Sequence, residues 1–212
     1  MVDAVGTTKH TYDLAGRMLT EDGPWSSDTV TYTYTNGLRW TLALQQPSGS
    51  YTQAYWYDSA KRLTNTTATS GKFGYGYHAG ASRQVKSLAL PNTAVITNAY
   101  DPIGRWTKTH LRTSGGTLLN GHDYQYDAGH RRTKQTYSNA SYVNYGYDRT
   151  DQLTSAFPYD SGNTLVSADK RGYLYDPAGN LKTRTNNAAL EGFTVDVQNQ
   201  LTSEPSGSFP SY

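Results

Sequence analysis

The feature that most constrains this chain is one phrase that is repeated nine times in 212 residues. Each copy is a tyrosine-rich run ending in Tyr-Asp, followed by a turn that usually contains Gly and then by basic and apolar residues. Six clear copies begin at Tyr12, Tyr57, Tyr100, Tyr126, Tyr147 and Tyr175, and three divergent copies begin at Tyr34, Tyr77 and Val195. Successive copies start 20 to 28 residues apart. A period in this range indicates a repeat architecture.

The segment after each tyrosine has the residues that a tight turn requires. An aspartate at the first position can accept hydrogen bonds from the amides just ahead of it, and a glycine at the fourth tolerates positive φ. Pro102 and Pro177 fall at the second position, where their fixed φ suits a turn and excludes a helix. We assign structural turn roles to Asp13, Gly16, Asp58, Asp101, Gly104, Asp127, Gly129, Asp148, Asp176 and Gly179.

The residues on either side of each turn predict a β-hairpin. Upstream, tyrosines occur in pairs two apart, such as Tyr55 and Tyr57, which places both on one face of a strand. Downstream, apolar and polar residues alternate, as in half-buried antiparallel strands. We therefore expect an all-β fold with essentially no helix: a single curved antiparallel sheet of stacked hairpins, an open or partly closed spiral or barrel-like strip of roughly eighteen strands.

Composition limits the remaining possibilities. Only 35% of residues are hydrophobic while 13% are aromatic, so we expect tyrosine rings and turns to stabilise the sheet in place of a thick aliphatic core. A net charge of +2 with interleaved signs predicts no nucleic-acid partner. The absence of cysteine excludes disulfides and cysteine-based zinc sites. We expect no cofactor, no metal site, no membrane span and no signal peptide.

The repeated Tyr-Asp-x-x-Gly-Arg-Leu phrase closely resembles the YD repeats of bacterial Rhs proteins, which are also found in toxin-complex C subunits and in animal teneurins. The resemblance covers residues 10–203. It implies a sheet of hairpins that spirals into a shell, a secreted or cell-surface location, and carbohydrate binding as one activity. Nine copies are too few to close the family's shell, so encapsulation is not carried over. We assign residues 1–212 to one repeat domain with a core at 10–203 and a tail at 204–212.

The four tryptophans are the candidate binding residues, because aromatic faces stack on the apolar faces of sugar rings. Trp56 lies between two repeat tyrosines and therefore projects from the opposite face of its strand. The alternative is burial of each ring against a loop or a second subunit. The candidate carbohydrate-binding residues are Trp25, Trp40, Trp56 and Trp106.

Two functions follow from these residues. The first is a binding or structural module that engages carbohydrate or a protein surface, with a possible homo-oligomer formed through unpaired sheet edges. The alternative is a small glycoside hydrolase with a carboxylate pair in a concave face of the sheet. The turn aspartates are already assigned to accept hydrogen bonds from turn amides, so the catalytic candidates are acids outside the repeat turns. These are Asp123, Asp160, Asp28, Asp169 and Glu21. Segments 22–30, 43–53 and 157–171 are the places where we expect functional loops.

Overall fold

The computed structural model of the chain describes residues 1–2, 4–80, 82–186, 189–204 and 207–208. It is an all-β structure whose one helical element is a 3-10 turn, η1 (Ser167–Asp169). The first ten strands are β1 (Lys9–Tyr12), β2 (Met18–Asp22), β3 (Val30–Thr35), β4 (Leu38–Gln46), β5 (Gly49–Tyr57), β6 (Leu63–Ala68), β7 (Gly71–Tyr77), β8 (Val85–Ala89), β9 (Val95–Tyr100) and β10 (Trp106–Arg112). The others are β11 (Leu118–Tyr126), β12 (Arg132–Tyr137), β13 (Tyr142–Tyr147), β14 (Leu153–Tyr159), β15 (Arg171–Tyr175), β16 (Leu181–Asn186), β17 (Ala189–Gly192), β18 (Thr194–Val195), β19 (Leu201–Glu204) and β20 (Gly207–Ser208).

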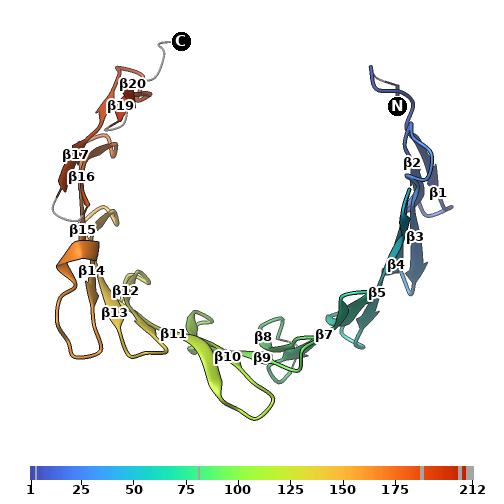
Figure 1. Cartoon of the computed structure of the whole chain (residues 1–212), viewed down its shortest axis with the longest axis horizontal. Helices are drawn as coiled ribbons and strands as arrows, with labels where there is room; N and C mark the ends of the chain where they lie inside the picture. Colours follow the sequence, from blue (N-terminus) through green and yellow to red (C-terminus); the bar gives the residue numbers. More distant parts are fainter. Residues whose placement is uncertain (3, 81, 187–188, 205–206, 209–212) are drawn as a thin grey trace. The chain divides into compact units, whose positions relative to one another are not determined.

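Strands β1–β17 belong to one sheet, and β18–β20 form a second, short one. From β1 to β9 and from β11 to β17, each strand pairs antiparallel with the next strand in the sequence (Figure 1). The prediction of an antiparallel sheet of stacked hairpins is therefore confirmed. Residues 43–53 belong to the β4–β5 hairpin, so the expectation of a functional loop there is wrong.

The chain divides into two compact units. Unit 1 comprises Met1–Asn98 and Leu111–Thr117, and unit 2 comprises Ala99–His110 and Leu118–Tyr212. The assignment of residues 1–212 to one domain stays a prediction. Most of the predicted tail, at 205–206 and 209–212, lies outside the described residues.

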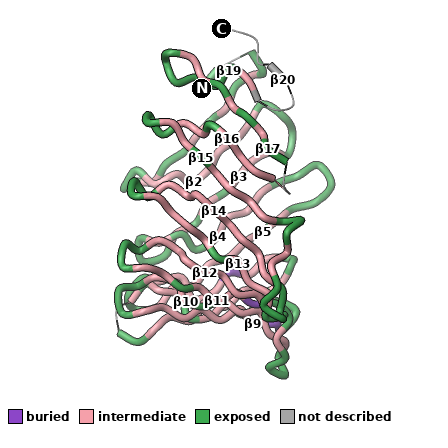
Figure 2. The backbone as a smooth tube through the Cα atoms, turned by 90° about the vertical axis from the view of Figure 1, so that its left-hand side faces the viewer, coloured by how far each residue is buried: buried purple, intermediate pink, exposed green. Residues whose placement is uncertain are grey.

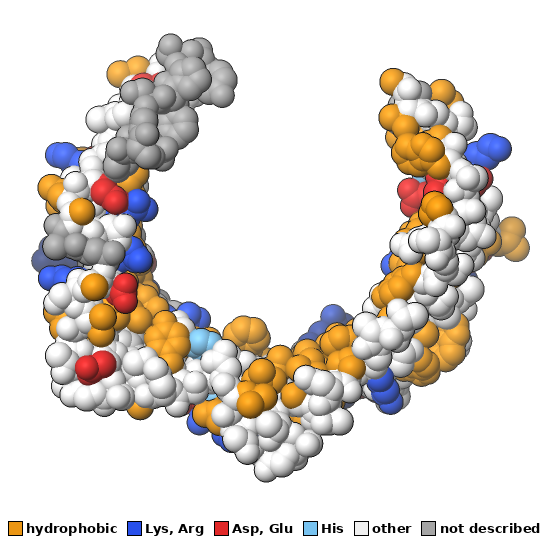
Figure 3. All heavy atoms as spheres, in the orientation of Figure 1, with side chains coloured by type: hydrophobic (Ala, Val, Ile, Leu, Met, Phe, Trp, Pro, Cys, Tyr) orange, Lys and Arg blue, Asp and Glu red, His pale blue; other side chains and the backbone are white. Residues whose placement is uncertain are grey.

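Neither unit has a thick core. Among the described residues, only Thr66, Ala94 and Gly121 are buried, and the strands consist mainly of half-buried residues (Figure 2). Hydrophobic side chains, tyrosine included, lie at the surface of both units (Figure 3). Stability must therefore come from contacts within each hairpin and between neighbouring hairpins, because a single layer of sheet has no interior.

Within a hairpin, the repeat aspartate organises the turn. The amide of Asp127 donates to the carbonyl of Arg131 at 3.0 Å, and the Arg131 amide donates to Oδ1 of Asp127 at 2.9 Å. The Arg131 side chain then donates from Nε to Oδ2 of Asp127 at 2.8 Å. The same three contacts recur in the turns that begin at Asp13, Asp58 and Asp101. One side chain thus satisfies the turn backbone and pairs with the cation that follows it.

The fourth turn position is left-handed in every one of these turns. Gly16, Gly104 and Gly179 have φ of 75°, 89° and 87°, as their predicted role requires. Gly129 lies within its predicted turn but one position early, so His130 takes the left-handed fourth position with φ of 67°. The position favours glycine but also accepts polar side chains at a modest cost.

Between hairpins, five of the repeat tyrosines contact the hairpin before them. The Tyr147 hydroxyl donates to the carbonyl of Arg132 at 2.8 Å, and the guanidinium of Arg131 lies 5.1 Å from the centre of the Tyr147 ring. The same hydroxyl bond joins Tyr34 to Met18, Tyr77 to Leu63, Tyr126 to Trp106 and Tyr175 to Leu153, at 2.7–3.0 Å. The carbonyl acceptor is always the residue after the basic or amide side chain of the turn. This explains why the tyrosine directly before the aspartate recurs.

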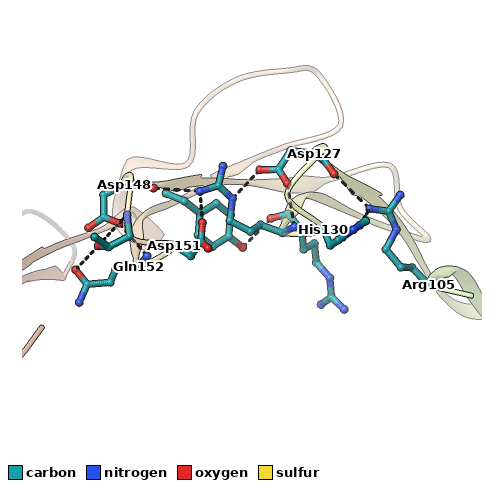
Figure 4. A network of polar contacts seen from close by, with 10 residues as sticks. Arg105, Asp127, His130, Asp148, Asp151 and Gln152 are labelled. Carbon is teal, nitrogen blue, oxygen red and sulfur yellow. Dashed lines mark hydrogen bonds and ion pairs between the residues drawn. The ribbon is translucent and has the colours of Figure 1, made fainter. Parts of the chain in front are cut away.

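The turns are also linked to one another by side chains. The Arg131 Nη1 donates to the Asp148 carbonyl at 3.0 Å and to Oδ1 of Asp151 at 2.8 Å, and Arg105 Nη1 contacts the Asp127 carbonyl and Nδ1 of His130 at 3.3 and 3.0 Å. Figure 4 shows these contacts running from Arg105 through the Asp127–His130 turn to the Asp148–Gln152 turn. We call this series of contacts, with the tyrosine hydroxyl bonds, the repeat ladder. It couples each hairpin to its neighbours.

We expect the fold to lose stability in acid, because the ladder uses ionised carboxylates. The amide of Arg131, followed by its side chain, lowers the pKa of Asp127, and the pKa values of Asp13, Asp58, Asp101, Asp148 and Asp176 are lowered as well. A carboxyl group whose pKa is lower in the folded state than in the unfolded state stabilises the fold at pH values above its unfolded-state pKa. This stability is lost as the pH falls through the folded-state pKa. Urea midpoints should therefore be level from pH 7 to about 5 and fall steadily below about pH 4. Equal midpoints at pH 3 and pH 6 would contradict this.

Candidate functional site

One candidate site lies in unit 1, where two predicted tryptophans meet. Trp40 of β4 and Trp56 of β5 contact edge to face, with ring centres 5.6 Å apart. Trp40 is 39% exposed, while Trp56 is half-buried by this contact. Trp56 is thus partly covered by another ring of its own chain. It is neither fully exposed for stacking nor fully buried against a loop.

Trp56 forms one wall of two adjoining hollows. One has a volume of about 390 Å³ and is bounded by Trp40, the β3–β4 turn and the Tyr57–Lys61 turn. The other, of about 190 Å³, is lined by Asn65, Thr67 and Lys72. We call Trp40, Trp56, Asn65, Thr67 and Lys72 the tryptophan groove. It combines two aromatic rings with an amide, a hydroxyl and an ammonium group, which are the groups that orient a polar ligand over an aromatic surface.

The polar members of the tryptophan groove were not identified from the sequence. Asn65 of β6 pairs directly opposite Trp56 of β5, and Thr67 of β6 pairs opposite Lys72 of β7. The antiparallel register therefore places these four side chains on one face of the sheet. The signal was available, because the turn at Asp58 fixes which residue of β6 lies opposite which residue of β5. The other two tryptophans lie elsewhere. Trp25 is 66% exposed in the loop after β2, and Trp106 of β10 is 47% exposed in unit 2.

Of the five acids proposed for hydrolysis, Asp123, Asp28 and Glu21 lie in separate contacts, whereas Asp160 and Asp169 line one cavity of about 580 Å³. Asp123 accepts a hydrogen bond from Nε2 of His110 at 2.9 Å, with Nζ of Lys108 at 3.8 Å. Asp28 accepts from the amides of Gly23 and Trp25 at 3.1 and 2.9 Å. Glu21 lies 3.9 Å from His10, and Asp169 ends η1.

Asp160 was predicted to lie outside the repeat turns, but the structure places it in a turn of the same kind. Its Oδ1 accepts hydrogen bonds from the amides of Gly162 and Thr164 at 2.9 and 2.8 Å, and Asn163 has φ of 67°. These are the contacts of a repeat turn, so Asp160 has the same structural role as Asp127. The phrase Tyr159-Asp160 is a further Tyr-Asp pair with its glycine one position early. Segment 157–171 therefore contains a repeat-like turn followed by η1.

The histidines near Asp123 belong to different contacts. His122 stacks on Tyr124 and its Nδ1 contacts Nε2 of Gln135 at 3.1 Å, whereas Asp123 contacts His110. Neighbouring residues of a strand project to opposite faces, as the sequence predicts for His122 and Asp123. In the part of the chain that the structure describes, no group of three or more His, Asp or Glu side chains is placed to hold a metal ion. The same part contains no helix of the length and apolarity needed to cross a membrane.

The fold is similar to that of chains in solved toxin-complex structures. Similar chains occur in the TcdB2–TccC3–Cdc42 crystal structure (TM-score 0.59, 16% identity), in TcdB2–TccC3 without its hypervariable C-terminal region (0.62, 14%) and in the Photorhabdus luminescens Tc holotoxin pore (0.62, 16%). Each match covers 93% of this chain but only 12–13% of the other chain. No protein-family model matches the sequence, and no curated protein sequence is significantly similar to it. At these identities the likeness shows the fold alone.

Proposed function

We propose that this chain is a YD-repeat structural module of an Rhs-like or toxin-complex-like protein, and that it presents the tryptophan groove to carbohydrate. The observation that supports the structural part is the repeat ladder. A sheet in which each hairpin contacts its neighbours through the same side chains can extend without a separate core, which suits a protein wall. The toxin-complex chains that share this fold are consistent with such a role.

The binding part of the proposal rests on the tryptophan groove. A sugar ring has an apolar face that stacks on indole and hydroxyl groups that hydrogen-bond to amide, hydroxyl and ammonium groups. Trp40 and Trp56 supply the rings, and Asn65, Thr67 and Lys72 line the hollow beside Trp56. The family resemblance supports a secreted or cell-surface location as part of the same proposal. A protein surface, or a second copy at a sheet edge, is the competing partner.

Trp56→Ala tests the binding part of the proposal. In a panel of uncharged polysaccharides, we expect this substitution to weaken binding of the polysaccharide that the unmodified chain binds most tightly. The expected loss is about 10-fold or more, since about 1.4 kcal/mol of lost stacking energy is a factor of ten in affinity. Affinity electrophoresis of the purified chain measures this. Trp25→Ala is the matched control, because it removes a ring that is 66% exposed and does not line the tryptophan groove.

The same panel separates binding from hydrolysis. We expect binding without turnover. Asp160 and Asp169 line one cavity, but Oδ1 of Asp160 is held by two turn amides, and no described contact joins a candidate acid to a second carboxylate. Chromogenic glycosides assayed in parallel should give no product. Turnover that disappears in Asp123→Asn would overturn the proposal in favour of a glycoside hydrolase.

A further inference from the structure

One hairpin of unit 2 has a small residue where the others have larger ones. The upstream tyrosine of each repeat pair lies opposite one residue of the return strand. In five hairpins that residue is Leu42, Thr66, Leu88, Gln135 or Arg184. In the hairpin of β13 and β14 it is Ala156, opposite Tyr145. Because its methyl group is smaller than all five side chains, the sheet is hollowed beside Tyr145.

A cavity of about 580 Å³ opens at this point. Ala156 lies in β14, between Tyr145 of β13 and Tyr173 of β15, and all three residues line the cavity. Tyr137 of β12 lines it as well, and Val166 contributes from the connection between β14 and β15. The volume lies within the range of ligand sites. We call this cavity, with its aromatic walls and small floor, the Ala156 groove.

The Ala156 groove offers hydrogen-bond donors and an acid to a ligand. In the part of the chain that the structure describes, the hydroxyls of Tyr137 and Tyr173 make no hydrogen bond. Asp169 is exposed, and no described side chain forms an ion pair with it. Arg171, the one cation among the described lining residues, donates to Oδ1 of Asn186. The groove thus has an uncommitted carboxylate, whereas its cation is engaged.

We propose that the Ala156 groove binds a proline-rich segment of a partner protein, with a basic side chain of that segment on Asp169. Proline-rich segments adopt the polyproline II helix, which has no internal hydrogen bonds, so its carbonyl groups accept bonds from donors such as the Tyr137 and Tyr173 hydroxyls. Proline rings pack on aromatic walls, and the preformed helix loses little entropy on binding. The basic residue is chosen by charge complementarity to Asp169.

The spacing of the strands favours a polyproline II helix over an extended strand. Tyr145 and Tyr173 lie on strands that are separated by β14 and are therefore about 9.6 Å apart. In a polyproline II helix, side chains on one face recur every three residues, or about 9.3 Å. In an extended strand they recur about every 6.8 Å. A proline helix that crosses β13–β15 therefore places one ring against each tyrosine.

The test titrates a fluorescein-labelled peptide with the full chain and follows fluorescence anisotropy. The peptide has proline at every third position and one arginine, and in the control peptide every proline is replaced by alanine. The proline peptide should bind at least about 10-fold more tightly than the control peptide. Replacing its arginine by glutamate should weaken binding by a similar factor.

Charge variants test the contact with Asp169. Asp169→Asn should reduce the preference for the arginine peptide over the glutamate peptide, and the preference should also shrink as salt is raised. Asp151→Asn is the matched control, because it removes the same charge from an exposed turn of unit 2 that does not line the groove. It should leave the preference unchanged.

Volume variants test the floor of the groove. Ala156→Leu introduces the residue found at Leu42 and Leu88, so we expect its melting temperature to be retained while it fills the groove. It should weaken binding of the proline peptide about 10-fold or more. Ala128→Leu adds the same volume at an exposed turn outside the groove and should have no effect on affinity.

Tyr173→Phe keeps the ring and removes one donor, so it decides the matter even if Ala156→Leu fails to fold. It should weaken binding of the proline peptide about 5-fold, which corresponds to one hydrogen bond. Tyr75→Phe makes the same change in unit 1 and should leave the affinity unchanged.

Two results would overturn the proposal. The first is equal affinity for the proline and alanine peptides. The second is retention of the full affinity for the proline peptide in both Ala156→Leu and Tyr173→Phe. The site lies within unit 2 and shares no residue with the tryptophan groove, so loss of polysaccharide binding in Trp56→Ala affects neither result.

Discussion

Replacing the five ladder tyrosines by phenylalanine together should lower the free energy of unfolding by about 5 kcal/mol. Each substitution removes one hydroxyl that donates to a carbonyl of the preceding hairpin, and a hydrogen bond of this kind contributes about 1 kcal/mol. The five bonds join different pairs of hairpins and share no partner, so their losses should add. The substituted residues are Tyr34, Tyr77, Tyr126, Tyr147 and Tyr175.

The neighbouring tyrosines provide a control with the same chemistry. Tyr32, Tyr75, Tyr124, Tyr145 and Tyr173 lie two residues earlier and share a face with the ladder tyrosines. Among them, only Tyr145 has a described hydroxyl contact, a long one of 3.4 Å to Gln135. Their replacement by phenylalanine should cost about 1 kcal/mol in total. Urea unfolding measures both sets. Equal losses in the free energy of unfolding would contradict a special role for the ladder hydroxyls. Ring packing would then explain why tyrosine occupies the position directly preceding the turn aspartate.

The hairpins could be predicted from the sequence because the repeat carries local information. Aspartate at the first turn position and a return strand after the basic residue fix turn, register and pairing within a few residues. Repetition then predicts that neighbouring hairpins pair. The ladder itself could not be predicted in this way. It joins groups 14 to 25 residues apart, such as the Tyr147 hydroxyl and the Arg132 carbonyl, and only the three-dimensional offset between hairpins brings them together.

The candidate site was predictable only in part, for the same reason. Alternation placed Trp56 on the face opposite the tyrosines, but its contact with Trp40 depends on strands from successive hairpins. The Tyr-Asp phrase at Asp160 was not recognised, because it follows Asp148 by only 12 residues (160 − 148) while successive copies start 20 to 28 residues apart.

Close approach between hairpins should make Gly71→Ala a strongly destabilising substitution in unit 1. Gly71 begins β7 with φ of 112°, and a Cβ atom there would lie 2.5 Å from Cβ and 3.0 Å from Cγ of Pro91, in the turn between β8 and β9. Overlap with a ring held by its own backbone costs about 1–3 kcal/mol, in addition to the strain of the positive φ. We expect a total loss of about 2–4 kcal/mol in the free energy of unfolding.

Gly49 separates the two contributions, because it begins β5 in the same way. Its φ is 147°, and nothing lies within 4 Å of the Cβ position. Gly49→Ala should therefore carry the backbone strain alone, about 1 kcal/mol, and the difference between the two variants measures the contact with Pro91. Pro91→Ala would leave the β8–β9 turn free of the ring, and in that background Gly71→Ala should cost less. If Gly71→Ala and Gly49→Ala lose the same stability in urea, then neighbouring hairpin ends do not pack closely, and strand pairing together with the tyrosine and arginine contacts of the ladder holds the hairpins together.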